Sequence, residues 1–234
     1  MDSPPNMDID SWSLSEGGKV GYVQYGPRGS DFSAAIWDSA NNTQQELEGG
    51  DFPYDVEDTG WAIGSNGSRW LNGVLQPYEL GDATGASLTG INSFGMMAGT
   101  VGTAGVPGSK ATIWNSCGQI IFQLDRDSEF PFTTFGEVND SGVVTGWDNR
   151  TGQSNGMLWH ADTGIVNVNE LLESNSQQYH ITRLHHLTSG GVMSGQTIIN
   201  GVSRDVVLTP VPEPGTVIAL GAGLAALLRR RRAS

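Results

Sequence analysis

The sequence is poor in cysteine, in histidine and in positive charge. Its 234 residues include one Cys, four His, and 12 Lys and Arg against 25 Asp and Glu. The single cysteine, Cys117, excludes an internal disulfide, and no Cys–His spacing resembles a zinc site. The sequence provides no positioned base for Cys117, so we expect a structural role for it rather than a catalytic one. The net charge of −13 repels phosphate backbones and argues against nucleic-acid partners.

Recognisable catalytic and metal-binding motifs are also missing. The chain has no Gly-x-Ser-x-Gly elbow, no P-loop, no His-Glu-x-x-His pair and no complete EF-hand loop. His180, His185 and His186 are close in sequence. Adjacent residues of a strand point to opposite faces, so His185 and His186 are not expected to line one site. We therefore predict no catalytic, cofactor-binding or metal-binding residues.

Two short stretches concentrate negative charge, at Asp55–Asp58 and at Asp125–Glu129. Calcium requires about six to eight oxygen ligands from converging loops, and neither stretch supplies them alone. Both are therefore interpreted as solvated loops. A glycosidase needs two carboxylates at a defined separation, and the sequence cannot select such a pair among 25 acidic residues.

Turn-forming residues, by contrast, are abundant. The chain contains 33 Gly and 10 Pro. Gly and Asn tolerate the positive φ angles that tight turns require. Between the turns lie short runs of aromatic and β-branched residues, which are typical of strands. Residues 1–210 contain no long apolar helical pattern, so the sequence predicts an all-β body.

A pair of glycines four residues apart recurs five times along this body. The pairs are Gly17/Gly21, Gly60/Gly64, Gly95/Gly99, Gly142/Gly146 and Gly191/Gly195. Their first glycines are 43, 35, 47 and 49 residues apart. Polar residues precede most pairs, and an Asn or Asp close before Gly favours a hairpin turn. The repeat therefore predicts five similar structural units.

Tryptophan marks the same units. It ends a short strand-like run in four of them, at Trp37, Trp70, Trp114 and Trp159, and a leucine follows each, at Leu47, Leu80, Leu124 and Leu171. The fifth unit has Val206-Val207 in place of Trp. One tryptophan in each repeat is typical of packing between adjacent sheets, so these four are predicted to be core residues. Trp12, Trp61 and Trp147 break the repeat and are candidates for stacking against a ligand.

The third unit can be divided into four strands, at 87–91, 96–101, 110–115 and 119–124. Four short strands per unit favour a β-propeller of about five blades, and a β-sandwich is the alternative. The fifth unit lacks a clear fourth strand. Residues 1–10, or residues upstream of Met1, are expected to supply it.

The units resemble the HAF repeats of bacterial extracellular proteins. The shared features are an Asn-x-x-Gly turn, small residues before Gly, an Ala-x-x-Trp run such as Ala34–Trp37, and a later leucine. The phenylalanine that often precedes the family tryptophan is replaced here by Ile36, Ile113 and Leu158. This resemblance implies a β-rich extracellular module and no established reaction.

Residues 211–234 form a segment separate from the body at residues 1–210. Pro212 and Pro214 flank Glu213 and cannot continue a central strand. Residues 216–228 are uncharged and rich in Ala, Leu, Val and Ile, which predicts a short apolar helix. At 1.5 Å per residue it would span about 20 Å, less than the roughly 30 Å core of a membrane. Four arginines follow and favour the cytoplasmic side of a membrane, namely Arg229, Arg230, Arg231 and Arg232.

This order of Pro-Glu-Pro, apolar helix and terminal basic cluster resembles the PEP-CTERM sorting signal. The resemblance implies that an exosortase-type enzyme recognises Pro212, Glu213 and Pro214. It also implies that residues 216–228 anchor the protein transiently in the inner membrane, with Arg229–Arg232 as a cytoplasmic stop. Export would deliver the protein to the periplasm, outer surface or extracellular matrix of a bacterium that makes exopolysaccharide.

The N-terminus does not fit this destination. Residues 1–12 contain neither the basic nor the apolar part of a signal peptide. We therefore expect the true start to lie upstream of Met1, or the chain to be a truncated reading. The function predicted from the sequence is that of an exported, non-catalytic envelope or matrix protein that binds polysaccharide or envelope partners. A secreted carbohydrate-active enzyme on a propeller scaffold is the alternative.

Overall fold

The computed structural model of the chain describes residues 8–25, 32–49, 51–64, 67–76, 86–102, 110–124, 133–149, 153–176 and 178–211. Within these ranges, nineteen strands form five antiparallel sheets, and no α-helix occurs. The prediction of an all-β body is therefore confirmed. The predicted C-terminal helix lies outside the described residues. None of the described segments is a helix with the length and apolar character needed to cross a bilayer.

Each sheet is built from consecutive strands that pair in sequence order. Sheet 1 contains β1 (Asp8–Leu14), β2 (Lys19–Tyr25), β3 (Phe32–Asp38) and β4 (Thr43–Glu46). Sheet 2 contains β5 (Pro53–Val56), β6 (Trp61–Gly64), β7 (Arg69–Leu71) and β8 (Val74–Leu75). Sheet 3 contains β9 (Ala86–Ile91), β10 (Met97–Val101), β11 (Lys110–Trp114) and β12 (Ile120–Gln123). Sheet 4 contains β13 (Thr133–Val138), β14 (Val144–Asp148), β15 (Asn155–His160) and β16 (Gly164–Asn167), followed by a 3-10 turn, η1 (Val168–Glu170). Sheet 5 contains β17 (His180–Leu187), β18 (Met193–Ile199) and β19 (Val202–Leu208).

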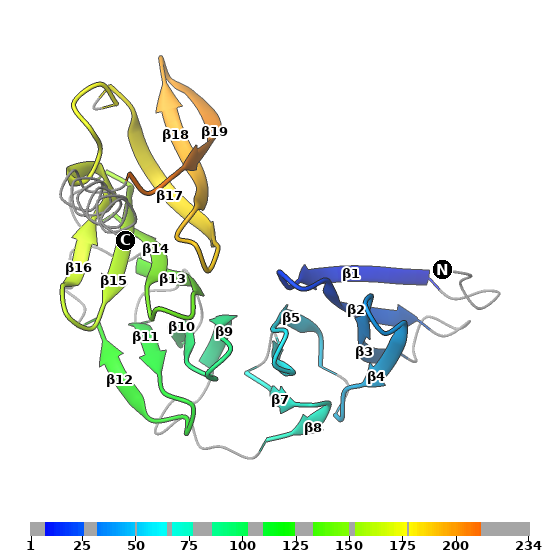
Figure 1. The fold of residues 1–234 in the computed structure, drawn as a ribbon. Coiled ribbons are helices and arrows are strands. Elements are labelled where there is room, and N and C mark those ends of the chain that lie inside the picture. The colour runs from blue at the N-terminus through cyan, green and yellow to red at the C-terminus, as the bar shows by residue number, and fades with distance from the viewer. Residues whose placement is uncertain are drawn as a thin grey trace, which may run out of the picture.

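The five sheets follow one another along an arc, as Figure 1 shows. The first strand of each sheet contacts the first strand of the next, in the order β1, β5, β9, β13 and β17. Because they contact one another in this order, the first strands lie on the inner side of the arc.

The four strands predicted for the third unit are confirmed to within one residue at each end.

The turn after each first strand has the same hydrogen bonds in all five sheets. The N–H of its first residue donates to the carbonyl four residues later, and a glycine N–H donates back to that first residue's carbonyl. The first residues are Ser15, Glu57, Asn92, Asn139 and Thr188. The glycines are Gly18, Gly60, Gly95, Gly142 and Gly191, with φ between 77° and 91°. A positive φ of this size favours glycine. The predicted assignment of Gly17 to this position is corrected to Gly18 by the turn geometry.

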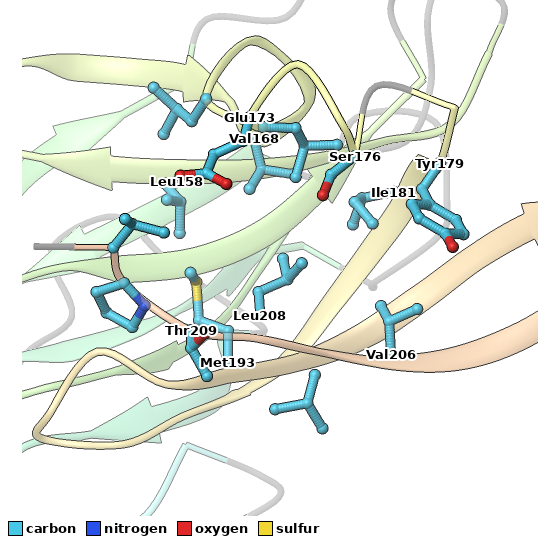
Figure 2. A pocket seen from close by; sticks show the side chains of 15 residues that line it. Leu158, Val168, Glu173, Ser176, Tyr179, Ile181, Met193, Val206, Leu208 and Thr209 are labelled. Atoms are coloured by element: carbon cyan, nitrogen blue, oxygen red, sulfur yellow. The ribbon is translucent and has the colours of Figure 1, made fainter.

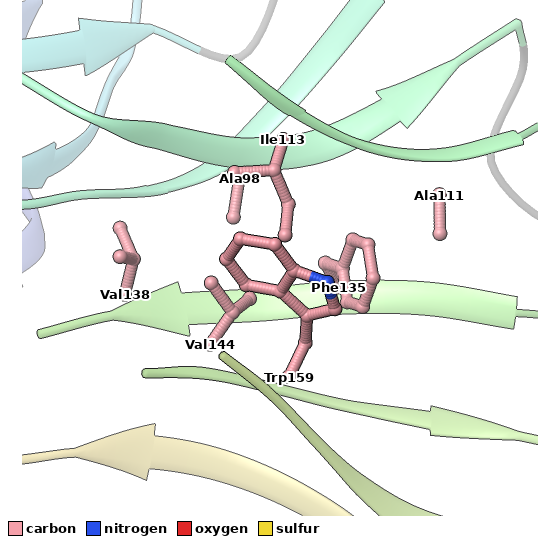
Figure 3. Close-up of a cluster of buried hydrophobic side chains, with 7 residues drawn as sticks. All are labelled: Ala98, Ala111, Ile113, Phe135, Val138, Val144 and Trp159. Carbon is pink, nitrogen blue, oxygen red and sulfur yellow. The ribbon is translucent and has the colours of Figure 1, made fainter. Parts of the chain in front are cut away.

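The hydrophobic core lies between neighbouring sheets. Trp70, Trp114 and Trp159 are each less than 6% exposed, and each packs against the preceding sheet. Figure 3 shows Trp159 of sheet 4 among Ala98 and Ile113 of sheet 3. The core role predicted for these three tryptophans is confirmed.

Trp37 differs from the other three because it is only half-buried. Its neighbour Ile36 faces sheet 2, and alternate strand residues point to opposite faces. Trp37 therefore lies on the face of sheet 1 that is turned away from sheet 2. The strand register also corrects the fifth unit. Leu208 lies opposite Met193, the place that tryptophan takes in the other sheets, whereas Val206-Val207 had been predicted there.

Sheet 5 has three strands within the described residues. Residues 8–10, part of the segment predicted to complete it, belong instead to β1 and pair with β2. That prediction is therefore wrong for these residues, because their hydrogen bonds are used within sheet 1. Residues 1–7 lie outside the described part of the chain.

Candidate functional site

Each of the five inner strands contains a β-bulge at the same position relative to its turn. A bulge places an extra residue opposite one residue of the partner strand and re-aims its side chain. The bulged residues are Trp12, Tyr54, Thr89, Gly136 with Glu137, and His185. Four of the five bulges line one cavity of about 310 Å³, which we call the bulge pocket. The Trp12 side chain lies outside the described residues.

Aromatic and imidazole groups dominate the bulge pocket. Tyr54 is 47% exposed there, and Trp147, His185 and His186 complete this part of the lining. The two histidines had been predicted to point apart, which is wrong. The bulge between Leu184 and His186 breaks strand alternation, so both adjacent histidines reach the same cavity.

A second central cavity, the acidic pocket, lies at the turn ends of the inner strands. It has a volume of about 250 Å³ and receives residues from all five sheets. Its carboxylates are Glu16, Asp55, Glu57, Asp58, Glu137 and Asp140. Glu137 lines both pockets, so the two cavities are neighbours along the centre of the arc.

The carboxylates of the acidic pocket accept hydrogen bonds from neighbouring sheets. Asp55 Oδ2 accepts from Ile91 N at 3.0 Å, and Glu57 Oε2 accepts from Ser93 Oγ at 3.2 Å. Asp58 accepts from the Ser15 hydroxyl. These bonds connect sheets 1, 2 and 3 through side chains rather than through strand pairing.

The remaining junctions use the same chemistry. Ser93 N donates to Asp140 Oδ1 at 2.9 Å and connects sheets 3 and 4. Glu137 accepts from Leu187 N at 2.6 Å, and its other oxygen lies 2.5 Å from His186 Nδ1. Glu16 accepts from both Ser189 N and Ser189 Oγ, at 2.7 and 2.8 Å. Sheet 5 is thereby hydrogen-bonded to sheet 1.

Burial and nearby like charges favour the protonated form of two carboxylates of the acidic pocket, Asp55 and Glu57. Burial raises the pKa of Asp55 well above its usual value, and the charges of Glu137 and Glu57 add to this effect. Burial, followed by the charge of Asp140, raises the pKa of Glu57 to about 7. In the bulge pocket, burial and then the neighbouring His186 lower the pKa of His185, which favours its neutral form.

The acidic stretch at Asp55–Asp58 is therefore not the solvated loop that had been predicted. Asp55 and Glu57 are partly buried and hold sheets 2 and 3 together. The second predicted acidic loop, at Asp125–Glu129, lies outside the described residues. Across the part of the chain that the structure describes, no three His, Cys, Asp or Glu side chains are grouped in a way that could hold a metal ion.

Each of the two described tryptophans proposed for ligand stacking has an arginine guanidinium lying over its ring. The Arg69 guanidinium lies 5.0 Å from the Trp61 ring centroid, and Arg183 lies 4.5 Å from that of Trp147. A cation–π contact of this kind covers one face of the indole. Trp147 still lines the bulge pocket, whereas Trp61 packs with the core between sheets 2 and 3.

Cys117 is exposed in the turn between β11 and β12.

The last described residues, Pro210 and Val211, lead into the segment that carries the predicted signal. Residues 210–232 match the PEP-CTERM protein-sorting motif. This motif implies that the protein is exported and processed by an exosortase-type enzyme. The predicted recognition residues Pro212, Glu213 and Pro214, and the basic cluster Arg229–Arg232, fall within the match but outside the described residues. No curated protein matches the chain.

Sequence reasoning missed the bulge pocket. Tyr54, Thr89 and His185 share no residue type and no local motif. Their equivalence follows only from the pairing of each inner strand with the next strand of its sheet. The turn glycine itself was the one available signal, because each bulge begins six residues before it.

Proposed function

We propose that the chain is an exported, non-catalytic protein of the bacterial envelope or matrix. Its body, residues 1–210, is a five-bladed β-propeller of HAF-like repeats, and residues 211–234 form the sorting and membrane-anchor segment. The observation that supports the propeller most directly is the junction between sheets 5 and 1. Ser189 N donates to Glu16 just as Ser93 N donates to Asp140, so the last and first sheets meet through the same kind of contact as sheets 3 and 4.

Hydrogen exchange tests ring closure. Replacing Glu16 by Ala removes the acceptor for Ser189 N, and the Ser189 amide should then exchange about five- to tenfold faster, because such a bond contributes about 1 kcal/mol. Glu173→Ala, which removes an exposed acid away from this junction, should leave the exchange rate unchanged. An unaltered Ser189 rate in Glu16→Ala would mean that the arc stays open in solution.

A non-catalytic role is supported by the way in which the acidic pocket is used. Each of its six carboxylates accepts a hydrogen bond from an adjacent sheet. Carboxylates held in this way connect the sheets and are not free to act on a substrate together. Binding is left to the bulge pocket, where the exposed Tyr54 ring and the His185 imidazole are available, whereas His186 is paired with Glu137. Aromatic rings and polar groups of this kind suit the faces and hydroxyls of a polysaccharide.

A glycan array tests this ligand class. The chain ending at Val211 should bind polysaccharide, with or without calcium, once its circular dichroism matches that of the full chain. Tyr54→Ala should weaken binding by about tenfold, since an aromatic contact contributes roughly 1 kcal/mol or more. Phe94→Ala removes an aromatic side chain that is 69% exposed outside the bulge pocket and should have no effect. Equal binding by the two variants would exclude the bulge pocket.

One observation favours the alternative of a carbohydrate-active enzyme. With a pKa of about 7, Glu57 is partly protonated near neutral pH, as a general acid must be. Release of reducing sugar from a polysaccharide by the wild-type chain, abolished in Glu57→Gln, would support the enzyme. Binding without any release would support the non-catalytic protein.

A further inference from the structure

The outer side of sheet 5 differs from that of the other sheets. Sheets 1 to 4 each have a fourth strand, whereas β19 is the outer strand of sheet 5 among the described residues. Val202 and Val207 of β19 are 51% and 69% exposed. An outer strand with exposed β-branched side chains is an adhesive edge that proteins normally cover.

An apolar pocket lies against this part of sheet 5. Its volume is about 610 Å³, larger than either central pocket. Figure 2 shows Leu158, Val168 and Ile181 on one side of it, with Met193 and Val206 on the other. Leu171 also lines it and is 59% exposed. A cavity with this lining offers apolar groups a place to be buried away from water.

The chain itself continues from the wall of the apolar pocket. Val211, the last described residue, is part of the lining and is 60% exposed. The uncharged segment 216–228 begins five residues later, within roughly 17 Å of extended chain. The pocket lining contains one charged residue, Glu173, whose sign is opposite to that of the arginines that follow the segment.

We propose that segment 216–228 occupies the apolar pocket whenever it is not inserted in a membrane. A short tether gives the segment a local concentration in the millimolar range, so the pocket meets it before any other apolar partner. Burial removes apolar side chains of both the segment and the pocket from water. Bilayer and pocket then compete for one segment, and membrane contact shifts the chain from the docked state to the inserted state.

Cysteine cross-linking tests this docking in the full-length chain. With Cys117 replaced by Ser, one variant carries Leu171→Cys and Ala222→Cys. A matched variant carries Val74→Cys and Ala222→Cys, because Val74 is 52% exposed but lies on sheet 2. In dilute, detergent-free buffer a short bismaleimide should link positions 171 and 222 within one chain, with a yield about tenfold above that for 74 and 222. Added phosphatidylglycerol vesicles should abolish the link.

A second variant separates docking from folding. Leu220→Asp with Leu224→Asp changes only the tail and should abolish the 171–222 link. It should also increase the fluorescence of the apolar dye ANS to the level seen with the chain ending at Val211, at unchanged circular dichroism. The proposal would be overturned by equal cross-linking yields at positions 171 and 74, or by links formed only between two chains. It would also be overturned if ANS fluorescence were the same for the wild-type chain, the Asp variant and the chain ending at Val211.

Discussion

Replacing Glu57 by Gln should stabilise the protein above neutral pH and leave its stability unchanged in mild acid. The pKa of Glu57 is about 7 in the folded protein, against 4.5 for an ordinary glutamate. Between these values the folded protein keeps a proton that the unfolded chain has released. The free energy of unfolding of the wild type therefore falls as pH rises through this window. Gln has no charge to lose, and its amide oxygen can still accept from Ser93 Oγ.

The size of the effect follows from the two pKa values. Their difference of about 2.5 corresponds to about 3 kcal/mol as an upper bound. Glu57 is only partly buried, and solvent screening reduces the expected gain at pH 8 to about 1–2 kcal/mol. For a chain of this size, that gain corresponds to a rise of about 2–8 °C in Tm. At pH 4 both proteins should have the same stability.

Urea unfolding followed by tryptophan fluorescence measures the difference at both pH values. Asp55 contributes to the pH dependence in the same direction. Because the charge of Glu57 adds to the raised pKa of Asp55, Glu57→Gln reduces the Asp55 contribution as well, and the measured gain includes both effects. Glu170→Gln is the control, since Glu170 is an exposed residue of η1 and its loss should change stability little at either pH. If Glu57→Gln gained nothing at pH 8, or lost equal stability at both values, the assigned burial and charge repulsion would be wrong.

Three further outcomes can be measured in the same way. Gly95→Ala should lower the free energy of unfolding by about 1–3 kcal/mol, because Gly95 has φ +77° and the new methyl would lie 3.0 Å from the Trp61 ring. Gly164→Ala should cost less, because Gly164 has φ +68° but open space around it. Equal losses in the two variants would contradict this. Trp114→Ala should cost about 3–5 kcal/mol by urea unfolding, since Trp114 is fully buried, and a loss below 1 kcal/mol would place it outside the core. Ending the chain at Val211 should move the protein from the membrane to the soluble fraction while its far-ultraviolet circular dichroism stays that of the sheets; loss of that spectrum would make the tail a core element.

Local turn chemistry explains what the sequence predicted correctly. The turn residues Asn92 and Asn139 each accept backbone N–H groups through their own side chains, so these hairpins are fixed within a few residues. The strands of the third unit and the buried positions of Trp114 and Trp159 follow from such turns and from strand alternation. These features need no information from distant parts of the chain.

Contacts between sheets decided the rest. From the sequence, Glu57 was predicted to be a solvated acid. In the structure, Ser93 of sheet 3 donates a hydrogen bond to it, and the charge of Asp140 of sheet 4 raises its pKa. Trp37 ends the same kind of strand-like run as Trp114, yet it is only half-buried. It lies on the face of sheet 1 that is turned away from sheet 2, so sheet 2 does not cover it.

The sequence by itself determined an all-β chain of five turn-punctuated units with a sorting motif at its end, since these depend on short-range backbone preferences and composition. The tertiary structure alone decided that His185 and His186 share a pocket and that Glu16 meets Ser189. A bulge depends on the register of two paired strands, and a contact across 173 positions depends on how all five sheets are stacked. Neither quantity is encoded in any local stretch of residues.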